Sequence, residues 1–186
     1  MLNFLPSPLH PAVVHLPMAL SVLLPLFALG ALWSIRRGTA PRKAWGITTA
    51  LFAALSLSAW ASLETGEDQE ERVEDVVAEA PIHSHEEAAE AFLFLSLGAL
   101  GVAALGLSRG RIGSVARVAG AVGSVALLGA GLRVGHTGGE LVYRYGAASA
   151  YTNTVTNVER AGSVEQPNAG RGAVRDDERR RDDDDR

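Results

Sequence analysis

Four long, mostly uncharged stretches constrain this chain more than any other feature of its sequence. They cover residues 11–35, 44–63, 88–107 and 113–134. A helix needs about 20 consecutive apolar residues to cross the hydrocarbon core of a bilayer, and each stretch is long enough. Soluble helices show a polar face at 3.6-residue spacing, which these stretches lack over most of their length. We therefore predict an all-α fold, a four-helix transmembrane bundle in contact with the lipid bilayer.

The charged residues between these stretches predict the orientation. The first and third connections are basic and contain Arg36, Arg37, Arg42, Lys43, Arg109 and Arg111, with Arg117 just beyond. The second connection, residues 64–87, is acidic and contains one basic residue, Arg72. Lys and Arg mark the cytoplasmic side of a membrane protein. We expect a multi-pass protein of the cell's inner (cytoplasmic) membrane, with the N- and C-termini on the non-cytoplasmic side.

The first stretch is expected to be a retained helix and not a cleaved signal. A signal peptide has its basic residues before the apolar region, whereas here Arg36 and Arg37 follow it. We assign residues 1–151 to the membrane domain. Residues 152–186 lose hydrophobicity and end in a run of Asp and Arg, so we predict a disordered C-terminal tail.

Small residues and prolines suggest how the helices pack. Ala116, Gly120 and Ser124 recur at four-residue spacing, and Gly98 and Gly101 lie on the preceding helix. Small residues let helix backbones approach closely inside a bilayer, so we expect both sets at helix contacts. The first helix should be kinked at its two internal prolines, Pro17 and Pro25, because proline removes a backbone donor.

The acidic connection has an apolar pattern of its own. Val73, Val76, Val77 and Ala80 follow the i, i+3, i+4, i+7 spacing of an amphipathic helix. Such a helix would lie across the outer mouth of the bundle. A solvated acidic loop is the equal alternative.

Several function classes find no support in the sequence. The chain has no cysteine, which excludes disulfides, iron–sulfur clusters and covalently attached haem. No basic helix interleaved with aromatic residues is present, so nucleic acid is not an expected partner. No HExxH motif or other catalytic constellation occurs, and an enzyme is therefore not favoured, although the question stays open.

The five histidines gather at the predicted outer face. His10 and His15 begin the first helix, His83 and His85 precede the third, and His136 follows the fourth. Ionisable groups near membrane spans are often functional, although histidine is also tolerated at an interface. On an ideal helix, His10 and His15 point about 140° apart and need not bind the same ion.

The end of the fourth stretch contains a histidine among glycines. The segment runs from Arg133 to Gly146, and Gly135, Gly138 and Gly139 flank His136. A helix end followed by a turn is one interpretation. The other is a ligand loop, in which glycine makes room for a bulky group.

Three motifs in this chain resemble a known family. They are His10-Pro-x-x-Val-His-x-Pro17, Thr65-Gly66 followed by acidic residues and then His85, and Gly135-His-x-Gly-Gly-x-Leu-Val-Tyr-x-x-Gly146. Together they are similar to an uncharacterised family of predicted bacterial membrane proteins, domain of unknown function number twenty-two thirty-one. The family often has Phe at the place of Leu16. The resemblance covers roughly residues 9–146 and implies a four-helix membrane domain without an established activity.

Three hypotheses for the histidines remain open. The first is a b-type haem for electron transfer with a redox partner or within a larger membrane complex, because histidine from facing helices is a common axial ligand. His15 and His136 are its first candidates, His10 and His85 a second pair, Arg133 a propionate partner and Tyr143 a hydrogen-bond donor. This haem hypothesis requires His15 and His136 to face one inward cavity.

The second hypothesis is a zinc or copper site, structural or used in metal handling. It would use the same imidazoles and a carboxylate from Glu64, Glu67, Glu86 or Glu140. The third is a cofactor-free membrane scaffold or accessory subunit, in which the histidines serve as hydrogen-bonding or pH-sensing groups.

Overall fold

The computed structural model describes residues 8–152 and is α-helical. The helices are α1 (His10–Val13), α2 (His15–Arg36), α3 (Pro41–Glu74), α4 (Glu79–Leu105) and α5 (Gly110–Tyr143). The predicted disordered tail lies outside the described residues, apart from Thr152. Residues up to Ala148 form one compact unit, which contains all five of these helices.

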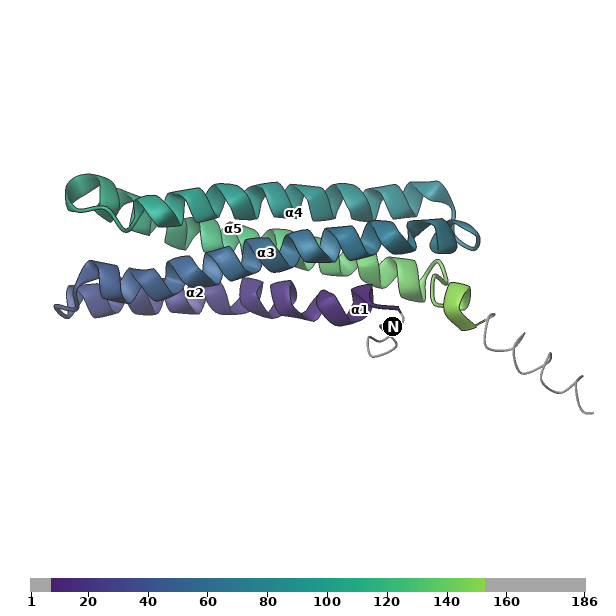
Figure 1. Ribbon diagram of the computed structural model, residues 1–186, viewed down its shortest axis with the longest axis horizontal. Coiled ribbons are helices and arrows are strands. Elements are labelled where there is room, and N and C mark those ends of the chain that lie inside the picture. The colour runs from purple at the N-terminus through teal and green to yellow at the C-terminus, as the bar shows by residue number, and fades with distance from the viewer. Residues whose placement is uncertain (1–7, 153–186) are drawn as a thin grey trace, which may run out of the picture. The chain divides into compact units, whose positions relative to one another are not determined.

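The four long helices run side by side in alternating directions (Figure 1). Helix α3 packs against α2 and α4, and α5 also packs against α2 and α4. Helices α2 and α4 therefore lie diagonally opposite each other in the bundle. Short connections enforce the antiparallel order. The first connection turns at Gly38, whose φ of 98° is a left-handed conformation that favours glycine.

Length and surface chemistry identify a membrane bundle. All four long helices are long and apolar enough to cross a bilayer. Each also turns large apolar side chains outward, among them Leu26, Leu57, Phe94 and Val122, which are 63–70% exposed. Such a surface is unfavourable in water and favourable against lipid. The chain is an integral membrane protein on these grounds, as the sequence predicts.

Two helices extend well beyond the apolar stretches. Helix α3 has 34 residues and continues through the acidic segment to Glu74. Its residues after Leu63 add about 16 Å at 1.5 Å per residue. The predicted separate amphipathic helix across the outer mouth is therefore wrong, and so is the alternative of an acidic loop for residues 64–74. The pattern instead serves a small second core, in which Val77 and Ile82 pack with Ala147, flanked by Val73 and Leu141.

The expected disturbance of the first helix occurs at Pro17. A proline nitrogen cannot donate to the carbonyl four residues earlier, which here belongs to Val13. The helix is interrupted at this place, with α1 ending at Val13 and α2 beginning at His15. Pro25 lies within α2 without ending it.

Small residues make close helix contacts on α5 but not where expected on α4. Ala116, Gly120 and Ser124 are all buried, as predicted. The prediction for Gly98 and Gly101 is wrong, because both are exposed and an added Cβ would meet no atom within 4 Å. Helix α4 instead contacts its neighbours through the face that includes Ser96, Ala99 and Ala103.

Candidate functional site

All five histidines lie at the same end of the bundle. This end contains the beginnings of α1, α2 and α4 and the end of α5 (Figure 1). The basic α2–α3 and α4–α5 connections lie at the opposite end. Alternating helix directions thus bring together histidines that are far apart in sequence.

His10 attaches α1 to α3. Its Nδ1 atom lies 2.9 Å from the carbonyl oxygen of Ser62 and 3.4 Å from Oγ1 of Thr65. A carbonyl oxygen can only accept, so Nδ1 of His10 carries the proton and donates. In the neutral form of this half-buried imidazole, the lone pair lies on Nε2.

His85 makes an equivalent connection between α4 and α5. Its Nδ1 atom lies 2.9 Å from Oγ1 of Thr137. The Thr137 hydroxyl donates its own proton to the carbonyl of Val134 at 3.1 Å, so it accepts from His85. The half-buried His85 ring therefore also carries a proton on Nδ1, and in its neutral form the lone pair lies on Nε2.

The two anchored rings meet inside the end of the bundle. Their centroids are 6.3 Å apart and their planes cross at 86°. His10 is the first residue of α1 and His85 belongs to α4, so the pair brings together side chains from two different helices at this end of the bundle. We call His10 and His85 the histidine pair. Fixing a ring through Nδ1 while Nε2 holds the lone pair is typical of metal-binding histidines.

Two glycines make room for the histidine pair. A Cβ at Gly66 would lie 3.3 Å from Cε1 of His10, and one at Gly138 would lie 3.0 Å from Cε1 of His85. Gly135, Gly138 and Gly139 lie inside α5, which continues to Tyr143. The predicted helix end after residue 134 is therefore wrong, as is the predicted ligand loop. The bulky group that Gly138 accommodates is the His85 ring.

The other three histidines have exposed side chains. His15 is the first residue of α2, and its side chain is exposed on the surface of the bundle. The side chain of His136 is 76% exposed, and its Nε2 lies 4.0 Å from Oε2 of Glu140. His83 is exposed and lies near Glu86 and Glu87, at 3.5 and 3.4 Å. The pairing of His15 with His136 in one inward cavity, which the sequence favours, finds no support in this packing.

The remaining expected ligands do not converge on the histidine pair. Arg133 is exposed on α5 and Tyr143 is 91% exposed. Within residues 8–152, no group of three or more His, Asp or Glu side chains could hold a metal ion. Among these described residues, the structure therefore brings together the imidazoles of His10 and His85 without a third ligand of these types.

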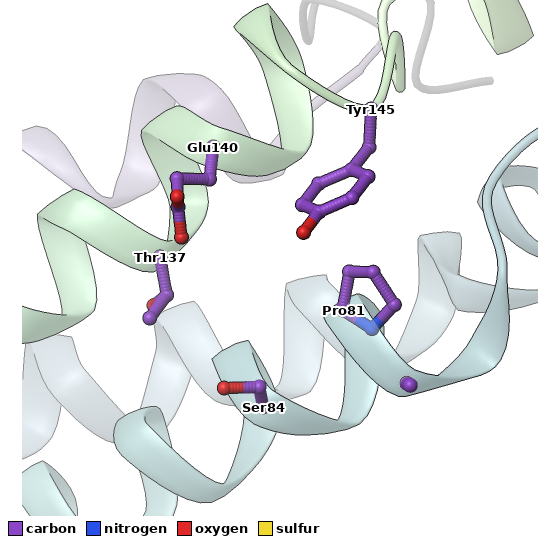
Figure 2. A pocket seen from close by; sticks show the side chains of 6 residues that line it. Pro81, Ser84, Thr137, Glu140 and Tyr145 are labelled. Atoms are coloured by element: carbon purple, nitrogen blue, oxygen red, sulfur yellow. The ribbon is translucent and has the colours of Figure 1, made fainter.

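Sequence reasoning missed the residues that hold the histidine pair and those that line a neighbouring cavity. Ser62 and Thr137 give no sign of their role, because their partners are more than 50 residues away. The cavity has a volume of about 220 Å³ and lies between the start of α4 and the end of α5 (Figure 2). Its lining consists of Ala80, Pro81, Ser84, Thr137, Glu140 and Tyr145.

Comparisons of this chain with protein-family models, with curated proteins and with solved structures gave no match.

Proposed function

We propose that this chain is a multi-pass protein of the bacterial inner membrane that binds b-type haem through His10 and His85 and transfers electrons to a redox partner or within a larger membrane complex. Both termini lie outside the cytoplasm in this proposal, so the histidine pair is at the outer face. Membership of the family that the three motifs resemble is part of the same proposal. The observation that carries it is the pair of hydrogen-bonded imidazoles, one from α1 and one from α4, whose ring centroids are 6.3 Å apart.

The number of ligands favours haem over zinc or copper. Zinc is bound in proteins by three or four side chains, whereas haem needs no more than two axial ligands because the macrocycle supplies the others. The site offers two imidazoles, and no larger group occurs within residues 8–152. A zinc or copper role, structural or in metal handling, stays as the alternative that elemental analysis tests.

The two rings are close enough together to serve one bound group, since their centroids are 6.3 Å apart. His10 and His85 are the residues that would hold the haem. Ser62 and Thr137 would hold the rings in place, which raises the basicity of the coordinating nitrogen.

The chain's own residues would bind and orient the group, which when bound supplies one-electron transfer. The partial burial of His10 and His85 would limit the access of water to the bound group. Arg133 and Tyr143, the residues proposed from sequence to contact the haem, are exposed and would have to act from the rim.

The experiment is an optical spectrum of the full-length protein purified in detergent from cells supplied with a haem precursor. We expect a Soret band and a reduced α band. His10→Ala or His85→Ala should abolish both bands, whereas His15→Ala and His136→Ala should retain them. His85→Met should retain haem with a raised reduction potential, because Met/His ligation raises it.

Two outcomes would overturn the proposal. If the bands disappear in His15→Ala and His136→Ala but survive in His10→Ala, the exposed histidines are the ligands. If the wild-type protein has neither haem nor stoichiometric zinc or copper, the cofactor-free scaffold is correct, and the histidine pair simply connects four helices.

A further inference from the structure

The cavity beside the histidine pair has walls of two kinds. Ala80, Pro81 and the ring of Tyr145 form apolar surfaces. Ser84, Thr137, Glu140 and the Tyr145 hydroxyl provide oxygen atoms. Figure 2 shows these side chains around one gap, with the Tyr145 hydroxyl directed into it. A concave site with apolar walls and a few convergent polar groups is typical of small-molecule binding.

The polar groups of the cavity can still form hydrogen bonds. Within residues 8–152, the hydroxyls of Ser84 and Tyr145 make no hydrogen bond to protein. Each can donate one bond and accept others. Glu140 accepts from Arg144 through Oε1 at 3.0 Å, and a carboxylate retains further acceptor sites. A matching ligand must therefore offer at least one hydrogen-bond donor to the Glu140 carboxylate. It must also offer an oxygen atom to the hydroxyls of Ser84 and Tyr145.

The charge at the cavity favours a neutral ligand. The charge of the Glu140 carboxylate is neutralised by Arg144. On the other side of this carboxylate, Nε2 of His136 lies 4.0 Å from Oε2 of Glu140. The Arg144 guanidinium also lies 5.4 Å from the centroid of the Tyr145 ring. A cation would meet this arginine and lose much of the attraction of Glu140, and an anion would meet the carboxylate.

The volume of the cavity suits a ligand of about one ring. Drug-sized ligands occupy pockets of about 300–1,000 Å³, and this cavity of about 220 Å³ is smaller. Tyr145 and Pro81 offer flat and apolar surfaces suited to an aromatic ring. We propose that this cavity binds a neutral, single-ring aromatic molecule with two hydroxyl groups, as in the headgroup of a quinol.

Thr137 links the cavity to the histidine pair. Its side chain lines the cavity and accepts the hydrogen bond from Nδ1 of His85. A bound ligand would therefore lie one residue away from the ring that we assign to haem. Binding at the cavity does not require haem, so this inference goes beyond the proposed function and can be tested without it.

The test measures binding of 1,4-dihydroxybenzene to the full-length protein in detergent, by saturation-transfer NMR and titration calorimetry. We expect saturable binding, and much weaker binding of 1,4-dimethoxybenzene, which has the same ring but no donors. Tyr145→Phe should weaken binding about fivefold, the effect of one neutral hydrogen bond. Ser84→Leu should fill the cavity and abolish binding.

The matched control is Tyr143→Phe, because Tyr143 is 91% exposed and does not line the cavity. Its affinity should equal that of the wild type. Helix content and elution volume of each variant show that the bundle is intact. Equal binding of both ring compounds, or unchanged affinity in Tyr145→Phe and Ser84→Leu together, would overturn the inference. A missing Soret band with normal ring binding would contradict the haem proposal alone.

Discussion

At position 138, the absence of a side chain determines where the His85 ring can lie. An added Cβ would be 3.0 Å from Cε1 of His85 and 3.5 and 3.6 Å from its two nitrogens. The ring could not keep its present place and its 2.9 Å contact with Thr137 without a shift of α4 or α5. Gly139, one residue further on the same helix, has no atom within 4 Å of the same added group.

This difference makes Gly138→Ala and Gly139→Ala a matched pair. Gly139→Ala should stabilise the protein by up to about 1 kcal/mol, because alanine favours helix. Gly138→Ala should be less stable than Gly139→Ala by about 1–3 kcal/mol, the usual cost of overpacking. Denaturant titration in detergent micelles measures both. Equal stability of the two variants would show that the His85 ring is not confined by α5.

At the scale of a helix, the end of α4 depends on a residue of α5. Helix α4 ends at Leu105, and its last carbonyls have no partner within the helix. Arg117 is buried, 8% exposed, and its Nη1 donates to the carbonyl of Gly106 at 2.6 Å. A positive charge at a helix C-terminus also complements the helix dipole. The sequence pattern suggested a topological role for Arg117, and the structure adds this capping role.

Replacing Arg117 by methionine keeps an apolar stem and removes the donors. We expect Arg117→Met to lower the free energy of unfolding by about 1.5–3 kcal/mol, the range for hydrogen bonds to charged groups. Arg111→Met is the control, since Arg111 is exposed on the same helix, and should change stability by no more than about 0.5 kcal/mol. The same denaturant titration applies. A similar loss in both variants would point to a general effect of charge and not to the cap.

At the scale of the whole molecule, the two ends of the bundle differ in charge. The α2–α3 and α4–α5 connections are basic, and the opposite end holds the histidines and most of the acidic residues of α3 and α4. This segregation supports the proposed orientation, with the basic end in the cytoplasm.

The chain has no cysteine, so single introduced cysteines report the orientation directly. We expect Glu71→Cys and Glu79→Cys to react with a membrane-impermeant maleimide on intact spheroplasts. Lys43→Cys and Arg109→Cys should react only after the membrane is opened. The reverse pattern would place the histidine pair in the cytoplasm and would refute the proposed localisation, while the bundle itself would remain unaffected.

Sequence alone determined the class of this protein. Apolar length predicts the four spans, because a bilayer has a fixed thickness and every backbone donor within it must be satisfied. Alternating spans also place all five histidines at one end, whatever the packing. The local sequence pattern did not predict where the helices end. The charged residues after Leu63 and the glycines after Val134 are typical of a loop or a turn. Helices α3 and α5 nevertheless continue through them, because tertiary packing outweighs weak local propensity.

Tertiary structure alone decided which histidines meet. His15 and His136 are the more prominent in the sequence, but a helix position becomes interior or exterior through the rotation of each helix in the bundle. That rotation depends on long-range contacts such as those of Ser62 with His10 and Thr137 with His85. Apolar stretches without a polar face carry almost no information on rotation. The sequence therefore identified the end of the molecule that holds the candidate site, and only the packing selected His10 and His85 within it.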